Sequence, residues 1–445
     1  MPKITHRKKR LSSFKLIVLG FAGVIVLGAL ILMLPFSSTA GVVTPFHEAL
    51  FTSTSAVCVT GLVVQDTGSY WSAFGQTVIL LLIQTGGLGV VTVAALFAML
   101  SGRKISLMQR STMQDAISAP KVGGIVRLTR FIVRGTFLIE LIGMIVMLPT
   151  FCGNYGIKGI WMAAFHSISA FCNAGFDILG TAENKYPSLT GYIGNPAINI
   201  TIMLLIIVGG IGFLTWDDIY TNKWHFKKYR MQSKVILVTT AILIIAPAVF
   251  FFFCDFTGLP LAERILASLF QSVTPRTAGF NTTDLPAMTG SSKAIMNLIM
   301  LVGGSPGSTA GGMKTTTLAV LILSAFSVCR KKDDAEVCGR RIDGSAVKNA
   351  AAVAVMYFLL FFVGGIVIST AEGLPLSTCL YETASAVGTV GLTLGITPQL
   401  GVLSQLILIV LMYLGRVGGL TLIYAAVSNK NHSGAKLPLE KITVG

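Results

Sequence analysis

Charged residues are scarce in this chain: only 12% of its 445 residues are Asp, Glu, Lys or Arg, whereas 53% are hydrophobic. A soluble domain carries roughly 25% charged residues, so the composition excludes an ordinary soluble globule and indicates a polytopic membrane protein. A membrane-spanning helix needs about 20 mostly apolar residues. The stretches that qualify are Phe14–Phe36, Phe74–Leu100, Thr129–Phe151, Pro196–Trp216, Ser233–Phe253, Ala346–Ser369 and Gly401–Val427.

Metal-binding patterns and catalytic clusters are also missing from the sequence. The seven cysteines are scattered without a C-x-x-C pair, so neither a metal site nor a disulfide framework is visible. His47 and His166 lack a second imidazole or an H-E-x-x-H context, which favours packing or hydrogen-bonding roles for both. No nucleophile–base pair is visible at membrane depth. We therefore predict that the chain is not an enzyme.

Acidic residues are outnumbered by basic ones, and the net charge of +16 is unevenly placed. Lys and Arg collect before Phe14 and in Ser101–Arg134, Thr221–Lys234 and Arg330–Lys348. The intervening loops carry only Lys158, Lys185, Arg264, Arg276 and Lys293. By the positive-inside rule, this predicts a multi-pass protein of the plasma (inner) membrane with cytoplasmic N and C termini. A basic inner face against membrane lipid explains the charge better than a nucleic-acid partner does.

Four segments of the chain resemble one another. They are "FTSTSAVCVTGL" at 51–62, "FHSISAFCNAGF" at 165–176, "FQSVTPRTAGF" at 270–280 and "YETASAVGTVGL" at 381–392, and each contains a Ser and, further on, a Gly followed by Leu or Phe. A second element follows each segment: "GGLGVVT" at Gly86, "GGIGFLT" at Gly209, "GGSPGST" at Gly303 and "GRVGGLT" at Gly415. Each unit therefore reads as a spanning helix, a half-length helix, an extended turn with a glycine, and a second spanning helix.

The repeats predict the architecture. We expect an all-α polytopic membrane protein with eight spanning helices and four pseudo-symmetric helix–pore-loop–helix repeats around one central pore. The expected divisions are a basic cytoplasmic N-terminus (1–13), repeat 1 (14–110), repeat 2 (111–230), repeat 3 (231–340) with an interrupted second helix and a gate loop (303–317), repeat 4 (341–428) and a cytoplasmic C-terminal tail (429–445). Extended backbone inside a bilayer must be covered by protein or line a watery path, so the four turns should converge on one axis.

Convergence of four such turns favours a cation. Half-length helices that point their C-terminal ends at one centre bring partial negative charges together. Extended turns beyond them can aim backbone carbonyls inward as rings of four oxygens, which replace the water around an ion. Such a backbone needs φ > 0 at some position, which costs a non-glycine residue about 1–2 kcal/mol. This explains the aligned glycines, whereas close helix packing is the favoured role for "GGLG" and "GGIG".

At these residues the chain resembles the Trk/Ktr/HKT superfamily of cation transporters, most closely the potassium-uptake membrane subunits of its Ktr branch. The resemblance covers about Phe14 to Val427 and rests on the four repeats, the interrupted helix of the third and an Arg in the last helix. It implies potassium uptake by a homodimer with one pore in each subunit. It also implies a cytosolic RCK/KTN-type regulatory ring, KtrA-like, which binds nucleotide, and sodium as a modulator.

The resemblance assigns a selectivity filter whose backbone binds potassium. The filter residues are Val59, Thr60, Gly61, Asn173, Ala174, Gly175, Thr277, Ala278, Gly279, Thr389, Val390 and Gly391. Related plant transporters that prefer sodium carry Ser at the first filter glycine, so Gly61 favours potassium. The four turns differ in their side chains, which predicts weaker ion discrimination than in a symmetric homotetrameric channel. A sodium-coupled or sodium-permeable secondary transporter of the same fold stays open as an alternative.

The stretch "GGSPGSTAGGMKTTT" at 303–317 comes close to a phosphate-binding loop. Met313 separates its last glycine from Lys314, and an apolar run precedes it, so we expect no nucleotide on this chain. The resemblance makes it a gate below the filter. The gate residues are Gly303, Gly304, Ser305, Pro306, Gly307, Ser308, Thr309, Gly311, Gly312 and Lys314, together with Arg416 of the last helix.

Charges inside the membrane are functional candidates. Arg416 stands where the other repeats have Gly87, Gly210 and Gly304, and the resemblance makes it a barrier to cations in the pore. A structural pair with a carboxylate such as Glu140 is the alternative. Arg127, Arg130 and Arg134 have the spacing of a voltage sensor, but the chain has no room for a sensor bundle, and we assign them to the inner face.

Overall fold

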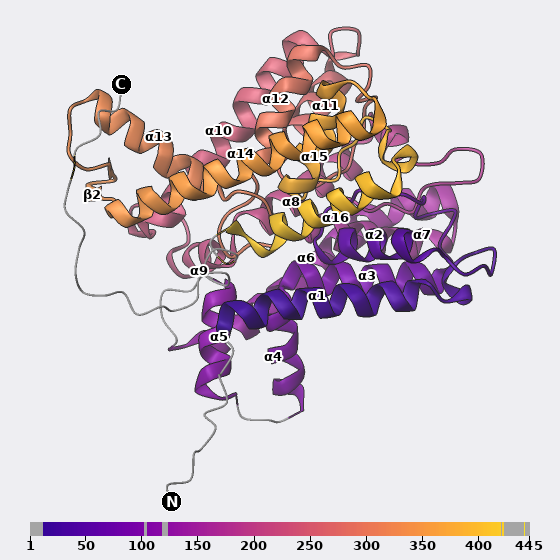
Figure 1. Cartoon of the computed structure of the whole chain (residues 1–445), viewed down its shortest axis with the longest axis horizontal. Coiled ribbons are helices and arrows are strands. Elements are labelled where there is room, and N and C mark those ends of the chain that lie inside the picture. The colour runs from indigo at the N-terminus through magenta and orange to yellow at the C-terminus, as the bar shows by residue number, and fades with distance from the viewer. Residues whose placement is uncertain (1–11, 102–104, 118–122, 420, 422–439, 441–445) are drawn as a thin grey trace, which may run out of the picture.

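The protein is described by a computed structural model that covers residues 12–101, 105–117, 123–419, 421 and 440 (Figure 1). The α-helices are α1 (Ser13–Leu32), α2 (Phe46–Val57), α3 (Ala73–Leu88), α4 (Val90–Leu100), α5 (Leu107–Ile117), α6 (Ile125–Tyr155), α7 (Lys158–Phe171), α8 (Pro196–Gly210), α9 (Phe213–Asn222), α10 (Met231–Cys254), α11 (Leu261–Val273), α12 (Gly290–Leu301), α13 (Thr315–Cys329), α14 (Gly344–Glu372), α15 (Leu376–Gly388) and α16 (Val402–Val417). Short 3₁₀ turns are η1 (Pro35–Ser37), η2 (Thr190–Tyr192), η3 (Phe226–Lys228) and η4 (Thr397–Gln399).

The predominantly helical structure supports the all-α part of the predicted fold class. One antiparallel hairpin, β1 (Glu336–Val337) with β2 (Arg340–Arg341), lies in the basic loop between α13 and α14 and pairs Glu336 with Arg341. Most of the basic N-terminus expected at 1–13 and of the tail expected at 429–445 lies outside the described residues.

Helix length and composition are those of a membrane protein. Within the described residues, α1, α6, α10 and α14 are each long and apolar enough to cross a bilayer, and the bent pairs α3–α4 and α8–α9 raise the number to as many as six. The apolar helices α13 and α16 are shorter. The expectation of eight spans, which counts α16 as one span and α12 with α13 as another, stays a prediction.

Two of the expected continuous spans are bent. The stretch Phe74–Leu100 divides into α3 and α4, which meet at 96°, and Pro196–Trp216 divides into α8 and α9, which meet at 98°. The break falls at Gly89 (φ +85°) and Gly212 (φ +91°), and Gly418 ends α16 in the same way (φ +87°). A left-handed residue ends a helix because its carbonyl leaves the helix axis, and glycine adopts that conformation without strain.

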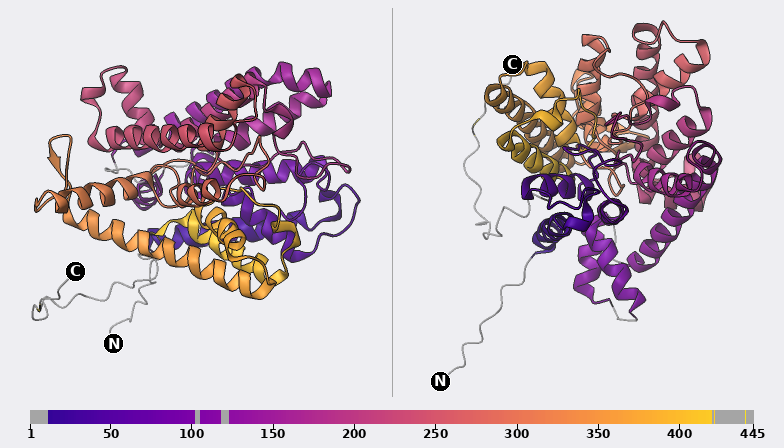
Figure 2. Two further views of the ribbon diagram at one scale, coloured as in Figure 1. Left: turned by 90° about the horizontal axis from the view of Figure 1, so that it is seen from above. Right: turned by 90° about the vertical axis from the view of Figure 1, so that its right-hand side faces the viewer.

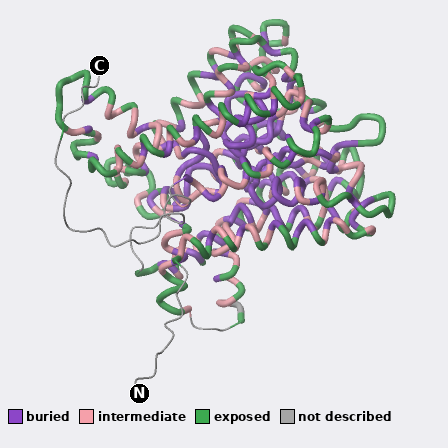
Figure 3. The backbone as a smooth tube through the Cα atoms, in the orientation of Figure 1, coloured by how far each residue is buried: buried purple, intermediate pink, exposed green. Residues whose placement is uncertain are grey.

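The helices pack in a cyclic order. The helix after each turn contacts the half-length helix of the next repeat: α3 with α7, α8 with α11, α12 with α15 and α16 with α2. The indigo, magenta, salmon and yellow parts of the chain accordingly surround a common centre (Figure 2, right). Buried residues gather at that centre (Figure 3). Apolar side chains of the outer helices, such as Leu27 and Phe358, are exposed, as on lipid-facing helices.

Glycines set how closely these helices approach. A Cβ placed on Gly86, Gly209 or Gly415 would collide with the backbone carbonyl of Val57, Phe171 or Val387, the aligned residues near the ends of α2, α7 and α15. The close-packing role predicted for "GGLG" and "GGIG" is therefore confirmed at their first glycines. Their last glycines, at 89 and 212, additionally end the helices.

Candidate functional site

The four aligned glycines have the left-handed backbone expected of them, with φ of +92°, +67°, +82° and +96° at Gly61, Gly175, Gly279 and Gly391. The sequence did not predict that the residue two positions earlier is also left-handed in each turn. These residues are Val59 (φ +52°), Asn173 (φ +59°), Thr277 (φ +69°) and Thr389 (φ +52°). Each costs about 1–2 kcal/mol, so the surrounding structure must impose the conformation.

The four turns form a closed ring. A Cβ on Gly61 would lie 2.5 Å from the carbonyl oxygen of Ala174 in the next turn. The same collision recurs around the ring, from Gly175 to the Ala278 carbonyl, from Gly279 to the Val390 carbonyl and from Gly391 back to the Thr60 carbonyl. Each turn therefore brings a carbonyl against the glycine of its neighbour, and no side chain fits between them.

Side chains of the half-length helices hold the turns in place. The Ser55 hydroxyl accepts a hydrogen bond from the Gly61 amide at 3.0 Å, and Ser385 does the same for the Gly391 amide at 2.9 Å. In the second turn the aligned Ser169 donates to the Phe176 carbonyl at 2.8 Å, and Thr274 donates to the Phe280 carbonyl. The recurring hydroxyl thus ties each turn to its own helix.

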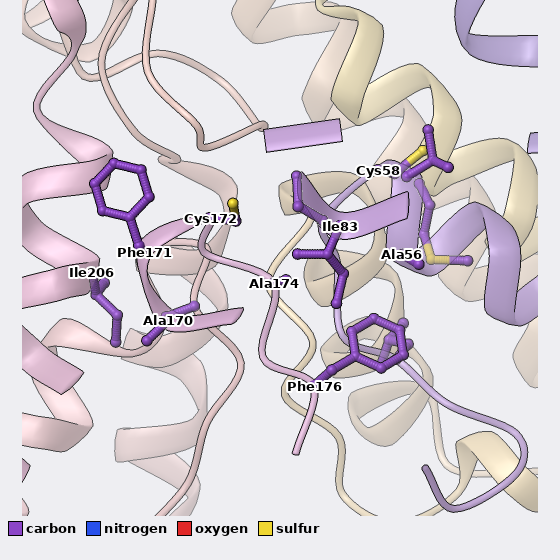
Figure 4. Packing of buried hydrophobic residues seen from close by; sticks show 14 of the residues in the cluster. Ala56, Cys58, Ile83, Ala170, Phe171, Cys172, Ala174, Phe176 and Ile206 are labelled. Atoms are coloured by element: carbon purple, nitrogen blue, oxygen red, sulfur yellow. The ribbon is translucent and has the colours of Figure 1, made fainter. Parts of the chain in front are cut away.

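A side-chain hydrogen bond that the sequence did not predict joins the second turn to the third. The Asn173 amide donates to Thr277 Oγ1 at 3.2 Å, linking the second turn to the third. In Figure 4 the backbone that carries Ala174 passes between Ile206 of α8 and Ile83 of α3.

His166 packs against the Phe151 ring at 5.1 Å, and its Nδ1 lies 2.8 Å from the Met162 carbonyl, which matches the predicted structural role.

All four glycines line one cavity of about 250 Å³ on the side of the turns that leads to the long interhelical loops. Asp66, Asp177 and Tyr186 also line it. The Asp66 carboxylate accepts from the backbone amides of Ser69 at 2.7 Å and Tyr186 at 2.9 Å, so it fixes the loop of the second repeat over the first. Burial and the nearby Asp66 charge raise the pKa of Tyr186, whose phenol donates to the Val64 carbonyl at 2.9 Å.

Two charged residues near the turns were misjudged or missed from the sequence. Arg276, counted above with the loop charges, is only 5% exposed and lies one residue before the third turn, with Nη2 3.3 Å from Thr240 Oγ1. Its position directly before Thr277, the first residue of the third turn, could have indicated from the sequence that Arg276 is buried. Glu382 is fully buried, and its carboxylate accepts from the Leu394 amide at 3.1 Å and from the hydroxyls of Thr393 and Thr397. It therefore anchors the loop that follows the fourth turn.

The predicted break between 303 and 317 is present as a folded loop between α12 and α13. Val302 pairs with Met313 in a parallel bridge, and the Gly303 amide donates to the Met313 carbonyl at 2.7 Å. The Ser305 and Thr315 hydroxyls lie 3.0 Å apart, and Ser308 donates to the Ser305 carbonyl at 2.7 Å. The loop thus satisfies part of its own backbone, as irregular structure at membrane depth must.

The same loop contacts the other repeats. The Ser305 and Thr309 amides donate to the Gly210 and Gly209 carbonyls at 2.9 and 3.2 Å, and the Gly307 carbonyl accepts from the Phe213 amide at 2.7 Å. Its far end is fixed by the Gly312 amide, which donates to the Gly415 carbonyl at 3.2 Å.

Two contacts place this loop directly against the turns. Thr309 Oγ1 lies 3.2 Å from Asn173 Oδ1, which belongs to the second turn. A Cβ on Gly311 would collide with the Thr389 side chain of the fourth turn. The loop therefore fills the space beside two of the four turns.

Arg416 lies against this loop. Its guanidinium donates to the backbone carbonyls of Thr309 and Gly86, and to that of Gly87 at 3.4 Å. Lys314 donates to the Ala310 carbonyl at 2.9 Å, and both cations line an inner cavity of about 290 Å³ together with Pro306 and Gly307. The alternative pairing of Arg416 with Glu140 is absent among the described ion pairs; Glu140 instead accepts from the Gln84 amide at 3.3 Å.

Comparison with known proteins decides the family. A family model described as "TrkH: Cation transport protein" matches residues 14–433. The chain belongs to the TrkH family of cation transport proteins. The predicted resemblance to the Trk/Ktr/HKT superfamily is thereby confirmed.

Relatives within the TrkH family match over nearly the whole chain. The "Potassium/sodium uptake protein NtpJ" of Enterococcus hirae is 39% identical over 98% of both chains. The "Ktr system potassium uptake protein B" of Bacillus subtilis is 37% identical over 92% of both chains, which supports the predicted likeness to the membrane subunits of the Ktr branch. A crystal structure of the potassium transporter TrkH from Vibrio parahaemolyticus shares the fold, with a TM-score of 0.74, 19% identity and coverage of 96% of this chain and 87% of that one. The chain is therefore a multi-pass membrane protein of a transporter family.

Proposed function

We propose that this TrkH-family protein takes up potassium through the plasma membrane by way of the four-turn ring. The observation that carries the proposal is the closed cycle in which each filter glycine abuts a carbonyl of the next turn. Relatives named as potassium uptake proteins, at 37% and 33% identity, support potassium as the substrate.

In the proposed mechanism, backbone oxygens of the four turns replace the water around a potassium ion. The turns are Val59–Gly61, Asn173–Gly175, Thr277–Gly279 and Thr389–Gly391. Alternating left-handed residues within each turn keep successive carbonyls on one side, so that they can form rings around an axis. The hydroxyls of Ser55, Ser169, Thr274 and Ser385 hold the spacing of these rings against the half-length helices.

The loop from Gly303 to Lys314 serves as the gate in this proposal. It lies against the second and fourth turns through Thr309 and Gly311, and Arg416 fastens it to α3 through the Thr309 and Gly86 carbonyls. The positive charges of Arg416 and Lys314 oppose a cation in the same passage. Opening then requires the loop to leave Arg416.

Control of the gate is assigned to other chains. We propose a homodimer in the plasma membrane with cytoplasmic termini, regulated by a cytosolic RCK/KTN-type ring that binds the nucleotide. The basic distribution of the inner loops supports the orientation. The relatives named as parts of a Ktr system support a partner subunit.

A sodium-coupled or sodium-permeable transporter is the second candidate. The Enterococcus hirae relative is named a potassium/sodium uptake protein, and the four turns carry different side chains. Counterflow of potassium in liposomes, with and without an imposed sodium gradient, separates the two. Accumulation that follows the sodium gradient would favour coupling, whereas indifference to it would favour passive uptake.

Growth of a potassium-uptake-deficient strain tests the main proposal. The wild-type chain should restore growth at limiting potassium, and Gly61→Ser should reduce growth or its preference for potassium over sodium. The matched control is Gly191→Ser, since a side chain at Gly191 meets open space. Full retention of growth and preference in Gly61→Ser would remove Gly61 from the filter.

A further inference from the structure

A further cavity lies outside the ring, between the first turns of α6, helix α9 and the start of α10. These segments enclose a cavity of about 610 Å³. Its lining includes Arg127, Leu128 and Phe131 of α6, Tyr220 of α9 and Arg230, which caps α10. Figure 1 shows α9 beside the same end of α6. None of these residues belongs to the ring or its gate loop.

The two arginines of this cavity differ in their pairing. Arg230 is neutralised by Asp217 at 3.0 Å and Asp218 at 3.3 Å. Arg127 is exposed and has neither an ion pair nor a side-chain hydrogen bond with any residue that the structure describes. Asp217 and Asp218 both pair with Arg230, so Arg127 is the guanidinium on the cavity wall that is left to meet an incoming anion.

The surroundings of Arg127 are aromatic and apolar. The rings of Phe131 and Tyr220 lie 5.4 Å apart on the cavity wall. Just beyond α9, Trp224 is 98% exposed and follows Lys223. Exposed Trp and Tyr beside Lys and Arg, at the end of the bent apolar pair α8–α9, are typical of the membrane–water interface.

We propose that this cavity binds the headgroup of an anionic phospholipid of the inner leaflet. The phosphate would be held by Arg127, while the acyl chains would lie along Phe131 and Leu128 on α6. Basic pockets between spanning helices on the cytoplasmic side are known to hold anionic headgroups. The inference rests on the orientation in the proposed function, and it adds a specific lipid site to the generally basic inner face.

Lipid retention by the purified full-length chain tests this site. The protein is reconstituted with phosphatidylglycerol or phosphatidylcholine at equal mole fraction, and co-purifying lipid is counted by native mass spectrometry. Phosphatidylglycerol should be retained over phosphatidylcholine, and Arg127→Gln should weaken its retention about fivefold, since one basic residue near an anionic surface contributes that much. Arg130→Gln is the matched control, because Arg130 is exposed on the same helix but does not line the cavity.

Several outcomes would overturn the proposal. They are equal retention of the two lipids, equal losses in the two variants, and displacement of the lipid by inorganic phosphate, which would indicate a soluble-anion site. Unchanged lipid retention in Arg127→Gln together with lost binding of the cytosolic ring would make the patch a protein interface. Lipid retention is measured without ion movement. Failure of the lipid site and failure of the proposed potassium uptake can therefore be distinguished.

Discussion

Replacing Arg416 by alanine should release the gate loop. The guanidinium donates to the Thr309 carbonyl of the loop and to the Gly86 carbonyl of α3, so only the first bond must break when the loop moves. A hydrogen bond to a charged group contributes roughly 1.5–3 kcal/mol. Its loss should therefore raise the ratio of open to closed protein by about 10- to 150-fold.

Rubidium or potassium flux into proteoliposomes measures this change in the absence of the regulatory ring. Arg416→Ala should raise basal flux strongly. Arg416→Lys should give an intermediate flux, since lysine keeps the positive charge but loses the planar fork that reaches two carbonyls. Basal flux equal to wild type in a folded Arg416→Ala protein would refute both proposed roles of Arg416, as a barrier to cations and as the residue that holds the gate loop.

Three further variants test the rest of the pathway. Gly175→Ala should abolish flux in liposomes because its Cβ would meet the Ala278 carbonyl, whereas Gly191→Ala should conduct normally; normal flux in both would contradict the ring. Deleting Ser305–Gly312 should raise basal flux and weaken control by the partner ring, and gating retained in reconstituted complexes would count against a gate there. Glu382→Gln should lower the free energy of unfolding by about 1–3 kcal/mol, because the glutamine –NH₂ would face groups that now donate to the carboxylate. The melting temperature and the preference for potassium over sodium should fall with it; unchanged values of both would show that the carboxylate is dispensable.

The sequence predicted the turns because their chemistry is repeated. A glycine at +67° to +96° leaves a residue-type signature, and four aligned copies make that signature visible. The left-handed Val59 and Thr389 leave none, since neither residue type favours that backbone. Both residues follow the last turn of a half-length helix. The Val59 and Thr60 amides donate to the Ala56 and Ser55 carbonyls, and the Thr389 and Val390 amides donate to the Ala386 and Ser385 carbonyls. These are the bonds of a helix end that is usually closed by glycine, so the residue type gives no signal.

Local signals were also present where the sequence was interpreted too simply. "GGLG" and "GGIG" were assigned to packing alone, but Gly89 and Gly212 also end α3 and α8. Arg276 was counted with the loops because charge patterning counts residues by segment, whereas its burial depends on the depth at which α11 ends. The partners of Arg416 are backbone carbonyls, and no sequence pattern distinguishes one carbonyl from another.

Competition for uptake by the purified protein tests the central claim most directly. Rubidium influx into proteoliposomes is measured with increasing potassium or sodium, for the wild type, Gly61→Ser and Gly191→Ser. The four-turn ring predicts that potassium competes at lower concentration than sodium in the wild type and in Gly191→Ser, and that this difference narrows in Gly61→Ser. Equal competition by the two ions in the wild type, or an unchanged difference in Gly61→Ser, would contradict it.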